Sequence, residues 1–180
     1  MLDKYDVLVI PGLGGSDKNH WQSIWEKKYP NFKRVEQDDW NNPNLSTWLE
    51  NLNISIKKST KPIVLIAHSL GCLLITHYVK NHNTNIEAVL MVAPPDVEVD
   101  DVIKELKDFA PMPKDKLPFR SIVVISSNDP YSTLTRSEEF AKNCGSKLVN
   151  IGDKGHINSS SNLDEWEEGE KLLLSLTNNH

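Results

Sequence analysis

A serine, an aspartate and a histidine follow three apolar stretches of the chain in that order, and together they could perform nucleophilic catalysis. Ser69 lies in Ala67-His68-Ser69-Leu70-Gly71, directly after the apolar run 62–67. A sharp turn between a strand and a helix exposes a nucleophilic serine, and it requires small residues two positions before and after the serine, because strand and helix cross closely there. Ala67 and Gly71 meet that size limit, although glycine is usual at both positions. The alternative is an ordinary strand–helix junction at which Ser69 caps the helix.

Two downstream positions could activate this serine. Asp129 follows the apolar stretch 121–126, and His156 follows the stretch 147–151. A hydroxyl becomes a useful nucleophile when an imidazole takes its proton, and a carboxylate must hold the other ring nitrogen. We therefore predict that Ser69 attacks, that His156 transfers protons and that Asp129 orients His156. The alternatives are an Asp-Pro turn for Asp129 and an exposed loop for His156.

Two other carboxylates compete with Asp129 for this role. Asp96 follows the predicted fourth strand and could serve in a variant arrangement. Asp153 precedes the histidine by three residues, and we interpret it as a turn residue.

Acyl transfer also needs donors for a developing oxyanion, and backbone N–H groups can supply them. One would come from Leu70, directly after the serine, and the second from Leu13 in the glycine-rich loop 11–16. The same loop could instead cradle a phosphate. The chain has Asp17 and Lys18 where the usual phosphate-binding patterns need glycine and a later Gly-Lys pair, which disfavours nucleotide binding. The candidates for the pocket wall lie in or just after this loop: Gly12, Gly14, His20 and Trp21.

Apolar runs that alternate with amphipathic stretches are typical of parallel strands joined by crossover helices. The sequence predicts a three-layer α/β sandwich with about six parallel strands, formed by residues 5–11, 32–36, 62–67, 86–93, 121–126 and 147–151. The predicted helices lie near 21–28, 46–58, 70–81, 136–143 and 163–176. Several strands are apolar at successive positions, as a sheet that is covered on both faces requires. Residues 1–180 would form one domain.

The connection 94–120 is the longest and is rich in proline, with a short helix predicted near 102–109. It could be a crossover segment or a small lid over the site. Because it is too short for a full cap domain, the sequence predicts an open, shallow pocket.

At the level of whole motifs, the chain resembles the small serine hydrolases of the retinoblastoma-binding-protein-9 type, which belong to the α/β-hydrolase superfamily. The resemblance rests on motifs spread over nearly the whole chain: 11–16 with His20-Trp21, 67–71, 128–131, and 155–158 with Trp166 beyond. It implies a compact α/β-hydrolase fold, and it places the catalytic serine, aspartate and histidine at Ser69, Asp129 and His156. The segment 94–120 matches no pattern of this family.

Composition excludes several other functions. The 180 residues carry a net charge of −5 without a basic stripe, which disfavours a nucleic acid partner. No segment has the apolar length of a membrane span, and we expect a soluble, cytoplasmic protein. Cys72 and Cys144 have no metal-ligand spacing, so we expect free thiols, no metal and no cofactor.

The function that these residues predict is cleavage of a small ester, thioester or amide through an acyl intermediate on Ser69. The alternative is a protein-interaction module that keeps the fold with little turnover, whose partner the sequence does not identify. Histidines and tryptophans outside the site are interpreted as packing residues. His68 is expected to point away from the serine, and Trp21 with Trp25 has the spacing of a core stripe.

Overall fold

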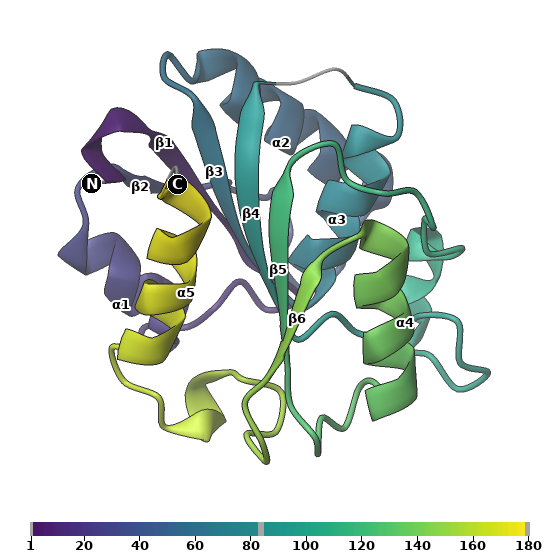
Figure 1. The fold of residues 1–180 in the computed structure, drawn as a ribbon. Helices are drawn as coiled ribbons and strands as arrows, with labels where there is room; N and C mark the ends of the chain where they lie inside the picture. Colours follow the sequence, from purple (N-terminus) through teal and green to yellow (C-terminus); the bar gives the residue numbers. More distant parts are fainter. Residues whose placement is uncertain (1, 83–84, 179–180) are drawn as a thin grey trace.

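The computed structural model describes residues 2–82 and 85–178. These residues form a six-stranded, wholly parallel sheet with helices on both faces (Figure 1). The spatial order is β2-β1-β3-β4-β5-β6, with strands at Asp6–Ile10, Phe32–Arg34, Ile63–His68, Ile86–Val92, Arg120–Ile125 and Lys147–Asn150, numbered along the chain. The predicted three-layer α/β sandwich is therefore confirmed.

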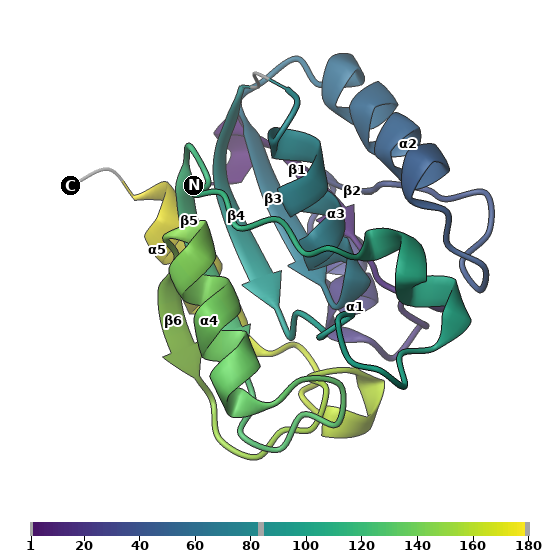
Figure 2. The ribbon, with the colours of Figure 1, turned by 90° about the vertical axis from the view of Figure 1, so that its right-hand side faces the viewer.

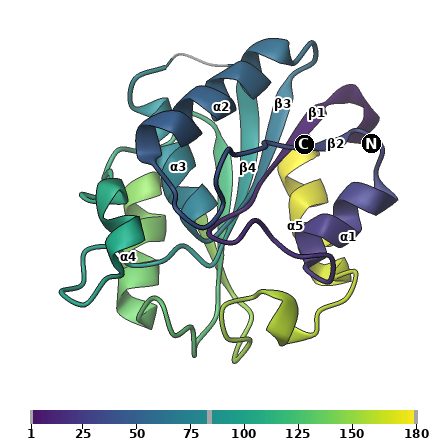
Figure 3. The same cartoon turned by 180° about the vertical axis from the view of Figure 1, so that it is seen from behind.

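Two layers of helices cover the sheet. Helices α1 (Trp21–Lys28) and α5 (Glu167–Thr177) pack on one face, and α2 (Leu45–Lys58), α3 (Leu70–Val79) and α4 (Leu134–Cys144) pack on the other. Figures 2 and 3 show the two layers from the side and from behind. Short 3₁₀ segments lie at Leu2–Lys4, Lys104–Phe109 and Ser159–Ser161.

The alternation of side chains between the two faces of the sheet explains why the central strands carry continuous apolar runs. In β1, Val7 and Val9 join the core under α1 and α5, whereas Leu8 and Ile10 join the core under α2, α3 and α4. Successive side chains of a strand point to opposite faces, so a sheet buried on both sides needs apolar residues throughout.

The order of the strands determines where the site lies. From β1 the chain passes to β2 on one side and then returns to β3 on the other side of β1. Loops after parallel strands meet at the carboxyl edge of the sheet, and ligands bind where the strand order reverses. The loops after β1, β3, β4, β5 and β6 therefore gather at one edge, next to the turn at Ser69.

Of the differences between the predicted and observed elements, three are informative. The second strand ends at Arg34 rather than at residue 36. The last helix begins at Glu167 rather than near 163, because Trp166 has a left-handed backbone (φ 44°) and stacks on Trp25 with a ring-centroid distance of 5.8 Å. The helix predicted near 102–109 is a 3₁₀ segment from Lys104 to Phe109.

Candidate active site

Ser69 occupies the turn between β3 and α3 with a backbone that L-residues rarely adopt, φ 53° and ψ −124°. Although Ser69 is the N-cap residue of α3, its side chain makes no capping hydrogen bond. Its hydroxyl instead lies 2.8 Å from Nε2 of His156. A strained backbone persists only where its surroundings hold it, which is typical of functional positions.

Small residues allow this turn to pack closely. A Cβ added to Gly71 would overlap the carbonyl oxygen of Ile10, and one added to Gly12 would lie 2.8 Å from the Cβ of Ser69. Strand β1 and its loop therefore press directly against the turn. Glycine is required at 71 by backbone contact, whereas Ala67 is fully buried and fits without a glycine.

The structure brings Ser69, His156 and Asp129 together. Nδ1 of His156 lies 3.0 Å from both carboxylate oxygens of Asp129, and Nε2 faces the hydroxyl of Ser69. The Asp129 side chain is only 3% exposed and the His156 side chain 9%. Because a carboxylate only accepts, Nδ1 carries the proton, and Nε2 is left with a lone pair directed at the serine.

Turns after β5 and β6 hold these two side chains in place. Oδ1 of Asp129 accepts a hydrogen bond of 2.9 Å from the backbone N–H of Tyr131. The side chain of Asn128 accepts one of 2.7 Å from Gly155 N–H, so the two loops are tied to each other. Gly155 itself has φ 55°, a left-handed turn that directs the chain back over the sheet edge at His156.

His68 lies closer to this cluster than the sequence predicts. It is buried, its Nε2 lies 2.8 Å from the backbone carbonyl oxygen of His156, and the two ring centroids are 4.9 Å apart. Burial, and to a lesser extent the neighbouring imidazoles of His20 and His156, lowers the pKa of His68 well below its usual value. A neutral His68 that donates from Nε2 supports the backbone of His156. The sequence gives no signal for this contact because it joins residues 88 positions apart.

His20 caps helix α1 and lines the cavity beside Ser69. Its Nδ1 accepts a hydrogen bond of 3.1 Å from Gln22 N–H, and its buried Nε2 has no hydrogen-bond partner among the described residues. Burial lowers the pKa of His20 to about 4. The ring is therefore neutral at pH 7, with its proton on Nε2.

Neither competing carboxylate is hydrogen-bonded to the ring of His156. Asp96 forms two hydrogen bonds with the guanidinium of Arg136, at 2.7 and 3.1 Å. Arg136 also pairs with Glu98 at 2.6 Å, which ties the segment after β4 to helix α4. Asp153 is exposed, and Asp129 is the carboxylate at the ring of His156.

The two predicted oxyanion donors, the N–H groups of Leu70 and Leu13, lie near the place where the loop that contains Gly12 packs against the turn at Ser69. Leu70 N–H belongs to the first turn of α3, where no intrahelical acceptor exists. Its nitrogen would be 3.0 Å from a Cβ added to Gly12. The loop turns back at Gly15, whose N–H donates to Gly12, and Leu13 lies within that turn.

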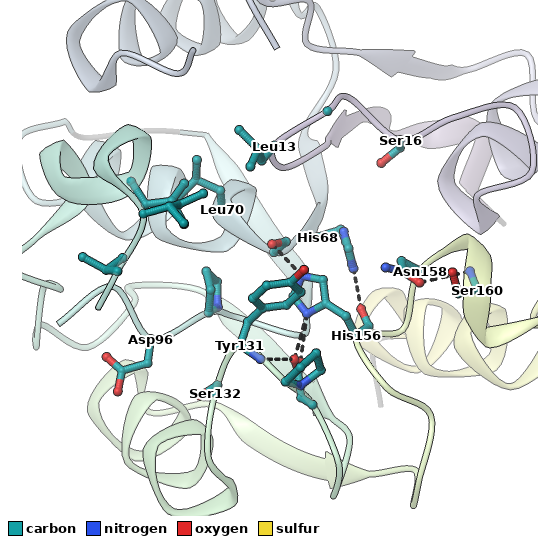
Figure 4. A pocket seen from close by; sticks show the side chains of 18 of the residues that line it. Leu13, Ser16, His68, Leu70, Asp96, Tyr131, Ser132, His156, Asn158 and Ser160 are labelled. Atoms are coloured by element: carbon teal, nitrogen blue, oxygen red, sulfur yellow. Dashed lines mark hydrogen bonds and ion pairs between the residues drawn. The ribbon is translucent and has the colours of Figure 1, made fainter. Parts of the chain in front are cut away.

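A cavity of about 800 Å³ opens beside Ser69 (Figure 4), which is within the usual size of ligand pockets. Residues between 95 and 106 form one wall of this cavity. Gly14 and His20 line it as expected. Gly12 and Trp21 do not: Gly12 packs on the turn, and Trp21 is buried behind the site, where its Nε1 donates to the carbonyl of Ile157.

The described ranges lack two kinds of feature. No group of three or more histidine, cysteine, aspartate or glutamate side chains there is placed to hold a metal ion. No helix within residues 2–82 and 85–178 has the length and apolar character that a membrane crossing needs.

Comparison with solved structures places this geometry among known folds. A provisionally described YdeN-like hydrolase from Pectobacterium atrosepticum is 32% identical, over 97% of this chain and 91% of its own, with a TM-score of 0.85. MGS-MChE2, an α/β-hydrolase enzyme from a lagoon-sediment metagenome, is 15% identical over 96% of this chain and 90% of its own, with a TM-score of 0.67. The fold is that of the α/β-hydrolases.

YdeN of Bacillus subtilis, which is described provisionally as a hydrolase, is similar to this chain in sequence and in structure. It is 34% identical over 80 residues, which span 42% of each protein, so this match covers less than half of the curated relative. Its crystal structure has a TM-score of 0.79 over 96% of this chain and 98% of its own, at 19% identity. The family model described as "Serine hydrolase" matches residues 7–175. The chain therefore belongs to this serine hydrolase family.

Proposed function

We propose that the protein cleaves a small ester, thioester or amide through an acyl intermediate on Ser69, with His156 as the proton carrier and Asp129 as its orienting carboxylate. The observation that carries the proposal is the continuous hydrogen-bonded row from the Ser69 hydroxyl through both nitrogens of His156 to Asp129. The strained backbone of Ser69 supports it, because an ordinary helix cap would need no such strain.

The chemistry follows from these positions. As the Ser69 oxygen bonds to the acyl carbon, its proton moves to Nε2 of His156, and the carboxylate of Asp129 stabilises the imidazolium. The N–H groups of Leu70 and Leu13 would hold the oxyanion. His156 then gives its proton to the leaving group as the bond to the acyl carbon breaks. In the second half, His156 takes a proton from water as the water oxygen bonds to the acyl carbon. His156 then returns a proton to the Ser69 oxygen as the bond between that oxygen and the acyl carbon breaks, which releases the acid and restores the enzyme.

Within the family, we propose that the chain is of the retinoblastoma-binding-protein-9 type and acts in the manner of a carboxylesterase. The motifs named above support the first statement. A cavity of about 800 Å³ next to the serine supports the second, because it admits an acyl chain of moderate length.

A series of 4-nitrophenyl esters from acetate to octanoate tests this function. We expect turnover of at least one ester by the wild-type protein, and loss of that turnover in Ser69→Ala. Activity that persists unchanged in a folded Ser69→Ala variant would show that the nucleophile is elsewhere.

A further inference from the structure

The cavity beside Ser69 has an apolar side and a polar side. Large apolar side chains that are exposed are concentrated at it: of seven such residues in the described chain, Leu13, Val99, Ile103 and Tyr131 line the cavity. Exposed apolar surface that is gathered in a concave site marks a place where an apolar ligand group binds. The segment 99–106 and Leu13 therefore form the apolar side of the cavity.

The other side is polar. Ser16, Asn158, Ser159 and Ser160 line it, and Figure 4 shows Asn158 and Ser160 on one side of His156 and Leu13 and Leu70 on the other. The loop that carries Asn158 follows His156 directly. Because His156 must protonate the leaving group, the leaving group lies toward this polar side and the acyl chain toward the apolar side.

The carboxylates that line the cavity give it a negative charge. Four aspartates and no lysine or arginine are among the described residues that line it. Two of these carboxylates are held by other side chains, since Asp129 accepts from Nδ1 of His156 and Asp96 is bound by the guanidinium of Arg136. Asp17 accepts hydrogen bonds from Ser159 and Asn19, and Asp101 adjoins the apolar side. The hydrogen bonds to Asp17 lower the pKa of its carboxyl group, which keeps it charged at neutral pH.

We propose that this pocket selects substrates with an uncharged, apolar acyl chain and an uncharged or cationic leaving group, and that Asp101 and Asp17 exclude anionic groups from the acyl side and the leaving-group side respectively. The proposal rests on the function proposed above. Esters and thioesters whose leaving groups carry phosphate, such as acyl thioesters of nucleotide cofactors, would be poor substrates.

Two matched substrate comparisons test the two sides separately. On the acyl side, 4-nitrophenyl hexanoate is compared with the 4-nitrophenyl monoester of adipic acid, which ends in a carboxylate. On the leaving-group side, the hexanoate esters of choline, 3,3-dimethylbutanol and isethionic acid present a cation, a neutral isostere and an anion. Each kcat/KM is divided by the rate constant of hydroxide-catalysed hydrolysis, which removes differences in intrinsic reactivity.

We expect the anionic member of each series to be at least about tenfold poorer, a size typical of one or two partly screened charges at close range. Asp101→Asn should reduce discrimination in the acyl pair by about threefold or more and leave the leaving-group series nearly unchanged. Asp17→Asn should do the reverse. Each variant removes one negative charge, so each is the matched control of the other, and Asp115→Asn removes a charge outside the cavity.

Equal corrected rates for anionic and neutral members, with esterase activity present, would overturn the charge selection. Discrimination that falls equally in all three variants would also overturn it, because net charge would then be the cause. The function proposed above fails in a distinguishable way, since no ester in either series would then be hydrolysed more slowly by Ser69→Ala than by the wild type.

Discussion

Asp129→Asn tests the hydrogen-bonded row most sharply, because the structure predicts how the introduced amide would turn. Oδ1 of Asp129 accepts a hydrogen bond from Tyr131 N–H, so the amide oxygen of the variant keeps that place. Its NH₂ group then faces Nδ1 of His156, where the second carboxylate oxygen lies at 3.0 Å. An NH₂ donor requires Nδ1 without a proton, which puts the ring proton on Nε2, toward Ser69. The imidazole can then no longer accept the serine proton.

The size of the effect follows from the loss of the base. The same change costs about 10⁴ in kcat in a well-studied Ser-His-Asp site, or about 5.4 kcal/mol of transition-state stabilisation. We expect kcat for a 4-nitrophenyl ester to fall by about 10³–10⁴ at pH 7.5, with KM changed by less than about threefold, because the carboxylate touches the imidazole rather than the substrate.

Two neighbouring carboxylates provide the controls. Asp153 lies three residues before His156 on an exposed turn, so the Asp153→Asn variant should retain the wild-type kcat. Asp96→Asn tests the variant arrangement, and kcat should fall far less than in Asp129→Asn because the Asp96 carboxylate is bound by Arg136. A folded Asp129→Asn enzyme with kcat within threefold of the wild type would refute the reasoning. So would a larger loss in Asp96→Asn.

Three further predictions concern the structure around the site. The pKa of His20 is about 4 in the folded protein, below the value of about 6.5 in the unfolded chain. Between these pH values the unfolded chain binds the extra proton, so the free energy of unfolding is highest above pH 6.5 and decreases as the pH falls toward 4. In urea unfolding, the free energy of unfolding should fall between pH 7 and pH 4 by about 3 kcal/mol more in the wild type than in His20→Asn, which retains a helix cap. An equal fall in both proteins would contradict the lowered pKa of His20. Gly71→Ala should lower the free energy of unfolding by more than about 2 kcal/mol, because its Cβ would overlap the Ile10 carbonyl oxygen, and an unchanged urea midpoint would disprove the close contact. His68→Leu should lower kcat about tenfold with little change in KM, and His68→Gln, which can donate to the His156 carbonyl, should recover part of it; no difference between the two would remove the positioning role.

The sheet could be predicted from the sequence because each strand carries its own signal. Val7 to Ile10 are apolar on both faces, and only a sheet covered by two layers of helices buries all four. The positions of Ser69, Asp129 and His156 could also be predicted, since residues that directly follow parallel strands must meet at one edge. Whether these three side chains form hydrogen bonds with one another depends on side-chain length and on the geometry of the loops that carry them.

Other features depend on contacts that no local pattern encodes. The start of α5 depends on Trp166 stacking on Trp25, and the support of His156 by His68 depends on a hydrogen bond across 88 positions. Segment 95–106 forms a wall because Arg136, far along the chain, binds Asp96 and Glu98. Proline content predicts irregular structure there, but not which partner holds it.

Covalent labelling of the folded protein tests the central claim most directly. The wild-type protein is treated with a fluorophosphonate at neutral pH, and the adduct is located by peptide mass spectrometry. We predict one adduct, on Ser69, that is absent from Ser69→Ala and from the urea-unfolded wild type, because only the folded site removes the serine proton. The absence of an adduct on the folded wild-type protein, or an adduct on another residue that persists in Ser69→Ala, would contradict the account.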